Sequence, residues 1–328
     1  MRKINIIRII GVTILFVDIL LIILYYYCSP ISKNSPYKII KIEKNMNTRK
    51  IASILKNNRI IKSELIFIIC SKIMKVTGKM KEGTYLLSGQ MPIKKIIKKI
   101  VNGECMQIKL TIPEGFTVEQ IGERIEKLGL GSKEKIIKIA KEKKLEGFLM
   151  PATYNIPLGF TESKILMTLN NNFNKIFNKY KKRCAELNMT PNQVITLASI
   201  IEKEAKIDEE RPIISAVFHN RLKKNILLES CATVQYIIGY KPFLLYSDLR
   251  VESPYNTYLH KGLPPGPICN PGEKSIIASL YPANVDYLYF VSNNDGTHKF
   301  SNTLQEHNLA KKHYKKLINK KIMDKLYN

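Results

Sequence analysis

The chain has 328 residues, is 45% hydrophobic and carries a formal net charge of +26, from 53 Lys and Arg against 27 Asp and Glu. That hydrophobic fraction excludes a disordered stalk, and the length leaves room for two or three compact domains. The positive charge favours anionic partners such as nucleic acid, anionic lipid headgroups or acidic wall polymers. Because Lys, Ile and Asn are all abundant, codon bias is an alternative source of much of the charge.

The sequence carries no pattern for a bound metal or nucleotide. Its five histidines lack HExxH spacing, and there is neither a P-loop nor a GxGxxG motif. No zinc-finger spacing or RNA-binding signature supports nucleic acid as a partner. The cysteines are too widely and irregularly spaced for zinc or a disulfide framework, so we expect mostly free thiols; they are Cys28, Cys70, Cys105, Cys184, Cys231 and Cys269. We therefore expect no metal and no cofactor.

The N-terminal segment predicts a membrane anchor. Residues 9–27 are almost unbroken apolar side chains, and about 20 such residues suffice for a helix to cross a hydrocarbon core. Basic residues precede this segment, and basic flanks stay in the cytoplasm. We therefore predict a cytoplasmic tail at 1–8, a transmembrane helix at 9–27 and an extracytoplasmic remainder. A cleaved signal peptide is the alternative, although Tyr26-Tyr27-Cys28 lacks the small residues of a cleavage site.

The chain after the anchor divides at turn signals. A polar linker at 28–36 comes first, and small strand and helix units then suggest one or two compact binding lobes. Strands are predicted at 37–42, 83–87 and 107–112, and helices at 47–57, 62–75, 92–101, 117–128 and 133–143. From about residue 161 the chain is mainly helical up to 223. Residues 230–271 are then rich in Gly, Pro, Tyr and Asn, and ordered loops of that composition usually carry function.

One predicted helix, beginning near residue 190, carries two carboxylates. Thr190 is a suitable N-cap, Pro191 fits the first turn, and Gln193 completes a capping box. The apolar residues that recur at helical spacing and should face a core are Val194, Leu197, Ala198, Ile201 and Ala205. Glu202 and Glu204 flank this stripe on opposite sides, each about 80° from its centre. Helical geometry alone therefore does not choose between them.

A carboxyl group at the edge of an apolar stripe can act as a general acid. Partial loss of hydration raises a carboxyl pKa, and a raised pKa is what an acid needs near neutral pH. The alternative is that Glu202 and Glu204 are both solvated surface residues.

The residues around this helix resemble the signature of the MltG (YceG-like) endolytic murein transglycosylases, beginning with LASIIEKE at 197–204. Further matching blocks occur in the family's order both before and after this stretch, and together they cover nearly the whole chain. They lie at 81–85, 112–115, 145–151, 217–222, 232–236, 253–258, 262–268, 270–272, 282–283, 287–291, 296–298 and at Phe300. Two positions depart from the family pattern. Ala152 stands where the family often has Asp, and Cys231-Ala232 stands where many members have Asp-Pro.

The resemblance implies an α+β fold in several parts. It implies an N-terminal transmembrane helix, a LysM-like extracytoplasmic region of α/β lobes at 37–158, and a transglycosylase catalytic domain at 159–328. The catalytic domain would have a helical first half and a loop-rich second half. The 37–158 region would hold the glycan strand; the alternative is a spacer that only positions the catalytic domain above the membrane.

The resemblance also implies a reaction and an acid. The family cleaves the bond between N-acetylmuramic acid and N-acetylglucosamine in nascent peptidoglycan strands without water, leaving 1,6-anhydro ends and terminating elongation. It places the catalytic glutamate at Glu202. Glu204 is the second choice, with a salt bridge to Arg211 or a nearby Lys as its structural alternative. A non-catalytic peptidoglycan-binding scaffold and a hydrolytic muramidase remain as alternative functions.

Loop residues and partners complete the expectations. Hydroxyl and amide groups suited to sugar hydroxyl and N-acetyl groups are offered by Gln235, Tyr255, Asn256, Thr257, Ser230 and Thr233. The alternative for each is loop scaffolding. The expected partners are peptidoglycan glycan strands, the cytoplasmic membrane and peptidoglycan synthases. The expected location is the cell membrane, crossed once, with the catalytic domain outside.

Overall fold

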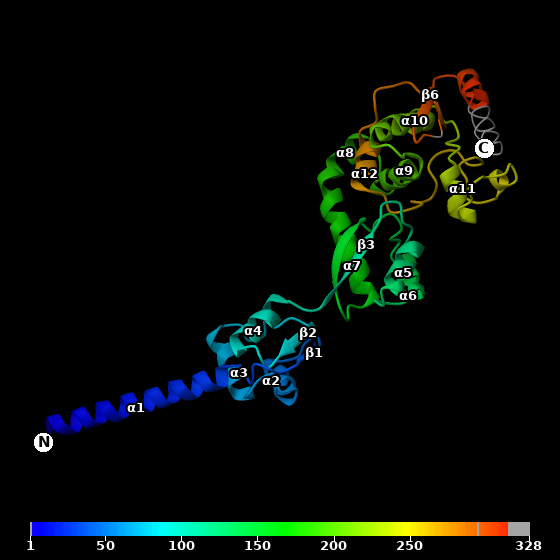
Figure 1. Ribbon diagram of the computed structural model, residues 1–328. Coiled ribbons are helices and arrows are strands. Elements are labelled where there is room, and N and C mark those ends of the chain that lie inside the picture. The colour runs from blue at the N-terminus through cyan, green and yellow to red at the C-terminus, as the bar shows by residue number, and fades with distance from the viewer. Residues whose placement is uncertain (1, 294, 314–328) are drawn as a thin grey trace, which may run out of the picture. The chain divides into compact units, whose positions relative to one another are not determined.

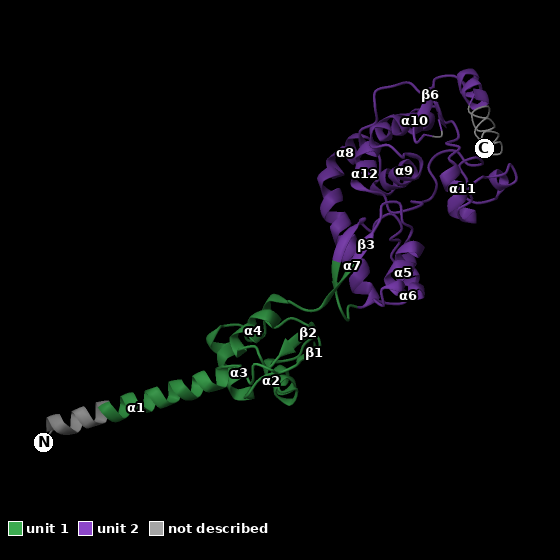
Figure 2. Cartoon of the chain, in the orientation of Figure 1, with its two compact units in different colours: residues 1–109, 155–160 green, residues 110–154, 161–328 purple. Residues whose placement is uncertain are grey.

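The computed structural model describes residues 2–293 and 295–313, with the backbone alone for 2–10. The chain divides into two compact units, which Figure 2 distinguishes by colour. Unit 1 comprises residues 1–109 and 155–160, and unit 2 comprises 110–154 and 161–328. Residues 110–154 therefore belong with the second unit, whereas the sequence grouped them with the region 37–158.

Unit 1 begins with the long helix α1 (Arg2–Cys28), drawn in blue in Figure 1. Its part Gly11–Cys28 is long and apolar enough to cross a membrane. A signal sequence near the N-terminus would satisfy the same criteria, so the anchor stays a prediction. The Lys62 ammonium group donates to the backbone oxygen of Tyr26 and to Ser29 Oγ, at 2.8 and 2.9 Å. These bonds satisfy groups at the C-terminal end of α1, where carbonyls lack partners within the helix.

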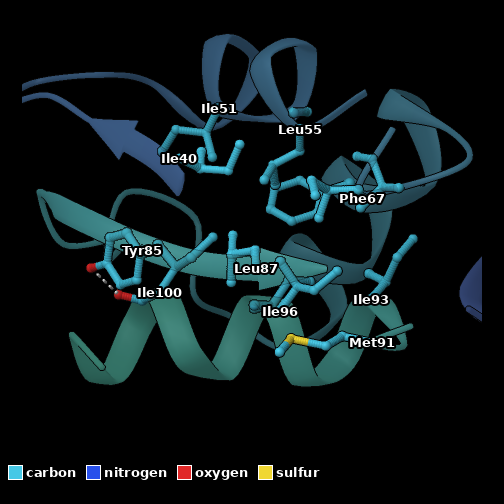
Figure 3. Packing of buried hydrophobic residues seen from close by; sticks show 14 of the residues in the cluster. Ile40, Ile51, Leu55, Phe67, Tyr85, Leu87, Met91, Ile93, Ile96 and Ile100 are labelled. Atoms are coloured by element: carbon cyan, nitrogen blue, oxygen red, sulfur yellow. Dashed lines mark hydrogen bonds between the residues drawn. The ribbon is translucent and has the colours of Figure 1, made fainter. Parts of the chain in front are cut away.

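The rest of unit 1 follows the predicted strands and helices closely. Its elements are β1 (Tyr37–Ile42), α2 (Thr48–Asn57), α3 (Glu64–Ile73), β2 (Gly83–Ser88) and α4 (Ile93–Asn102). Strands β1 and β2 pair antiparallel, with Tyr37 opposite Ser88 and Ile42 opposite Gly83. The core is formed from one face of this sheet and the apolar faces of the helices (Figure 3). The tyrosine in that core, Tyr85, donates its hydroxyl to the backbone oxygens of Lys81 and Ile100.

Unit 2 holds the remaining elements apart from the ends of two strands. They are β3 (Gln107–Ile112), α5 (Val118–Lys127), α6 (Lys133–Glu142), β4 (Ala152–Pro157), α7 (Glu162–Phe177), η1 (Asn178–Tyr180), α8 (Lys181–Glu186), α9 (Pro191–Glu204), η2 (Asp208–Glu210), α10 (Arg211–Lys223), α11 (Cys231–Ile238), η3 (Asp248–Arg250), α12 (Glu273–Leu280), β5 (Tyr289–Ser292) and β6 (His298–Ser301). The paired strands β3 and β4 contribute residues to both units. Strand β4, the β5–β6 hairpin and the short helix α11 were absent from the sequence-based prediction.

Helix α9 is the centre of unit 2. Its predicted start is confirmed, because Thr190 and Gln193 form a reciprocal capping box and Pro191 stands in the first turn. Eight successive residues, 194–201, are buried. The helix is therefore surrounded by protein on all sides, whereas the sequence predicted only one buried stripe. It packs against α12, α10, α11 and α8, and Figure 1 shows α10 and α12 beside it.

Candidate active site

The last turn of α9 brings Glu202 into an ion pair. Glu202 Oε2 accepts a hydrogen bond from the Gly272 amide at 3.0 Å and lies 3.4 Å from Arg211 Nη1. The side chains of both Glu202 and Arg211 are nearly buried. Arg211 also pairs with Asp208, at 2.9 Å between Nε and Oδ1. The ion pair with Arg211 that the sequence considered for Glu204 is thus made by Glu202.

A turn at residues 113–116 lies against Glu202. Gly115, at φ +75°, lies against Glu202, since a Cβ built on it would meet Glu202 Cγ at 3.6 Å. The Glu114 carboxylate packs closely on Gly272, so a Cβ at that position would require the Glu114 side chain to move. Burial raises the pKa of Glu114, and the Glu202 charge raises it further. Glu202 is therefore enclosed by backbone, a cation and a second carboxyl group.

Glu204 lies in a different environment two residues later. Its carboxylate accepts a hydrogen bond from Ser230 Oγ, and the side chain is partly buried. Burial raises the pKa of Glu204, although the bonds from Ser230 and the Ala232 amide and the charge of His298 act to lower it. Among the described residues, none forms a salt bridge with Glu204 within 4.0 Å. The Glu204 carboxyl group thus has a raised pKa and no salt bridge among the described residues, and both properties suit a proton donor.

Three of the predicted sugar-binding residues form a buried hydroxyl network beside Glu204. The Ser230 amide donates to Thr257 Oγ1 at 3.0 Å, and Thr233 Oγ1 donates to the Ser230 carbonyl at 2.8 Å. The two threonine hydroxyls lie 2.9 Å apart. All three residues are buried. The geometry favours the scaffolding interpretation for Thr233 and Thr257, which fix the position of Ser230 against the carboxylate.

Asn256 is likewise a structural residue. It is fully buried, and its amide nitrogen donates to the carbonyls of Leu249 and Val251 at 3.0 and 2.9 Å. Its side-chain oxygen accepts from the Tyr258 amide at 3.0 Å. With these groups bonded to the chain itself, Asn256 holds the loop together rather than facing a ligand.

Tyr255 and Gln235 are the predicted binding residues that remain partly exposed. The Tyr255 ring packs against Tyr236, with centroids 5.1 Å apart and planes at 44°. The Gln235 amide donates to the Lys241 carbonyl at 3.0 Å. Cys231, one of the departures from the family pattern, lies next to Ser230, and its sulfur is 3.1 Å from the Tyr258 hydroxyl.

The sequence reasoning missed a carboxyl–amide pair formed by the partly buried Glu146 and the fully buried Asn270. Both Glu146 oxygens accept from the Val118 amide, and Oε1 accepts from Asn270 Nδ2 at 3.1 Å. Asn270 also bonds Phe116 and Leu149, so it joins three segments that are far apart in sequence. Burial raises the pKa of Glu146 to about 7. Glu146 stands in the family-like block 145–151, which was the available signal, but nothing in that block indicates burial.

The described part of the chain contains no group of three or more His, Cys, Asp or Glu residues arranged to hold a metal ion. All six cysteines are free thiols. The absence of a cofactor stays a prediction from the sequence.

Comparison with known proteins identifies the family. The YceG-like family model matches residues 40–313, and the chain belongs to that family. A relative from Bacillus subtilis named endolytic murein transglycosylase is 36% identical over 87% of this chain and 87% of its own length. A protein of the same name from Streptococcus pneumoniae is 29% identical over 85% of this chain, which spans 58% of that longer relative. A crystal structure of a YceG-like protein from Listeria monocytogenes matches 84% of this chain and 100% of its own, at 34% identity and a TM-score of 0.58.

Glu146→Gln is expected to change how stability depends on pH. A carboxyl pKa of about 7 in the folded state lies above the unfolded value of about 4.3, so the folded state binds the proton more tightly. The contribution of Glu146 to the free energy of unfolding is complete below about pH 4.3 and is lost as the pH rises through about 7, at about 1.4 kcal/mol per unit of pKa difference. The neutral amide removes this contribution. Thermal midpoints at pH 5 and pH 8 should therefore differ less in the variant, and an unchanged difference would contradict the raised pKa.

Proposed function

We propose that this protein is an endolytic murein transglycosylase that cleaves peptidoglycan glycan strands between N-acetylmuramic acid and N-acetylglucosamine. Membership of the YceG-like family and 36% identity to a relative of that name support the proposal. The observation that carries it is the Glu204 carboxyl group, partly buried, held by Ser230 and without a paired cation among the residues that the structure describes.

We assign the acid to Glu204 in preference to Glu202, the first choice from sequence. A general acid must present its carboxyl group to the substrate, and the Glu202 carboxylate is already occupied by the Arg211 guanidinium group and the Gly272 amide. Arg211 lies beside Glu202, whereas Glu204 accepts a hydroxyl group. Glu204 also lies near the family-like blocks 232–236, in helix α11, and 253–258, through the Ala232 amide and the neighbouring Tyr258. Glu202 remains the alternative acid.

The reaction needs one carboxyl group in two successive roles. Protonated Glu204 donates its proton to the glycosidic oxygen as that oxygen leaves C1 of N-acetylmuramic acid, which develops oxocarbenium character. The resulting carboxylate then accepts the proton of the C6 hydroxyl of the same sugar, whose oxygen bonds to C1. The products are a 1,6-anhydro end and a free hydroxyl on the leaving sugar, and Glu204 ends protonated as it began. No water enters this sequence.

Glu204→Gln should abolish release of 1,6-anhydro products, because the amide keeps the shape but has no proton to donate. Loss of a general acid typically lowers the rate 10²–10⁴-fold. Glu202→Gln is the matched control: it should retain most activity and lower the thermal midpoint, because Arg211 loses a carboxylate partner. Mass spectrometry of digested sacculi measures the release of anhydro products by the two variants, and a thermal melt measures their midpoints. If the Glu202→Gln variant is inactive and the Glu204→Gln variant is active, the general acid is Glu202 and the assignment to Glu204 is wrong.

The same product analysis separates the alternative functions. Reducing ends in place of anhydro ends identify a hydrolytic muramidase. Sacculi that are bound but left intact by the wild-type protein identify a peptidoglycan-binding scaffold.

Ser230→Ala should shift the pH profile of cleavage in a defined direction. The Ser230 hydroxyl stabilises the ionised form of Glu204, so its removal should raise the carboxyl pKa further. An acid with a higher pKa stays protonated to higher pH, and the alkaline limb of kcat/KM should move upwards. Thr196→Ser, a change in the buried part of α9, serves as the control. An alkaline limb that stays in place, or moves down, contradicts the assignment of Glu204.

We further propose that α1 anchors the protein in the cytoplasmic membrane, with the rest of unit 1 and unit 2 outside, where nascent strands and their synthases are found. The apolar segment Gly11–Cys28 and the basic residues before it support this orientation. The predicted LysM-like region at 37–158 would hold the glycan strand there.

A protein that begins at Ser29 should keep its cleavage activity in solution and lose membrane association. The reason is that no residue of 11–27 belongs to the buried hydrophobic core, although Lys62 contacts Tyr26 near the end of α1. Cell fractionation and cleavage of purified sacculi measure the two properties. A C-terminal reporter active only in the cytoplasm contradicts the orientation.

A further inference from the structure

The segment between α11 and η3 exposes an unusual set of side chains. Within seven residues, Tyr240, Phe243, Leu245 and Tyr246 are 81%, 82%, 65% and 83% exposed. Single exposed apolar residues are ordinary, but a concentration of large ones marks a surface for a ligand or partner. We call residues 240–246 the aromatic loop. Figure 1 shows this yellow segment next to α11.

The aromatic loop has a defined shape despite its exposure. Lys241 Nζ lies 2.7 Å from Asp248 Oδ1, and this ion pair closes the ends of the loop. The second Asp248 oxygen accepts from the Leu245 amide at 2.9 Å. Pro242 restricts the backbone between them. A loop fixed in this way can present rings to a ligand with little further loss of conformational entropy.

The aromatic loop is also connected to the candidate active site. Gln235 in α11 donates to the Lys241 carbonyl at 3.0 Å, which ties the loop to that helix. Helix α11 begins immediately after Ser230, the residue that bonds Glu204, and ends at Ile238, with Gly239 alone between it and the loop. Eight residues at a rise of about 1.5 Å each make α11 about 12 Å long. The loop therefore begins about one short helix away from the reacting carboxyl group.

We propose that the aromatic loop is a remote binding surface for the glycan strand, on which the rings of Tyr240, Phe243 and Tyr246 stack against sugar rings beyond the bond that is cleaved. The proposal rests on the proposed function, because it takes the substrate class from it. Pyranose rings present an apolar C–H face and a rim of hydroxyl groups. Tyrosine matches both, since its ring is apolar and its hydroxyl group can form hydrogen bonds.

The charges around the loop favour a sugar ligand over an anionic lipid surface. Loops and helices that bind such membranes combine apolar side chains with free basic residues. Lys241, the cation within the loop, is already paired with Asp248. The connection of the loop to α11 through Gln235 also favours a sugar ligand, because the loop extends the candidate site and is not a separate surface.

The test is a full-length variant carrying Tyr240→Ser, Phe243→Ser and Tyr246→Ser together, with Tyr281→Ser, an exposed tyrosine at the end of α12, as the matched control. We expect KM for long uncrosslinked glycan strands to rise about tenfold, equivalent to about 1.4 kcal/mol. Values of kcat, and cleavage of the shortest oligomers that are still substrates, should not change, because remote contacts act on capture and positioning.

Binding without turnover separates failure of this proposal from failure of the proposed function. Labelled long strands are titrated with the Glu204→Gln protein, with and without the three serine substitutions. Equal binding overturns the role of the loop while leaving the function intact. Wild-type protein that neither binds nor cleaves strands overturns both. Loss of lipid-vesicle binding or of self-association in the triple variant, with strand binding retained, assigns the loop to a membrane or to a second copy instead.

Discussion

Burial of α9 is the constraint on which the arrangement of unit 2 depends. From residue 194 to 201 every side chain faces protein, with α8, α10, α11 and α12 packed around the helix. A charged group within that stretch would lose its hydration without compensation. The first charged residues of α9 therefore occur in its last turn, where neighbouring segments can supply partners. The candidate site is located at this end of the helix because residues 194–201 are buried and carry no charged group.

The two carboxylates of that turn differ because different segments reach them. Arg211, at the start of α10, and the Gly272 amide stabilise the charge on Glu202, which suits a structural ion pair. Ser230 and burial give Glu204 a raised pKa, which suits a proton donor. Enzymes commonly separate the roles of nearby carboxyl groups in this way, through environment rather than residue type. Residues that look equivalent in the sequence thus lie in different chemical environments.

Buried amides hold the loop-rich half of unit 2 in place. Asn256 closes the segment from Leu249 to Tyr258, and Asn270 joins the 113–118 turn to the segment around Leu149. Each uses its side chain where a helix or strand would use backbone bonds, so backbone groups that lack regular partners are still satisfied. The same loops position Ser230 and the aromatic loop. Because buried side-chain hydrogen bonds fix these loops, a region with little regular structure can still hold its side chains in defined positions.

The sequence by itself determined the local elements and the family. Capping boxes at Thr117 and Thr190 and the apolar periodicities depend on residues a few positions apart, so they were predictable. The choice between Glu202 and Glu204 was not, because both flank the apolar stripe symmetrically. Nor were β4, the β5–β6 hairpin and the place of residues 110–154 in unit 2. Only the tertiary structure decided the surroundings of the two carboxylates and the place of these elements, because both depend on partners brought from distant parts of the chain, such as Arg211, Ser230 and Asn270.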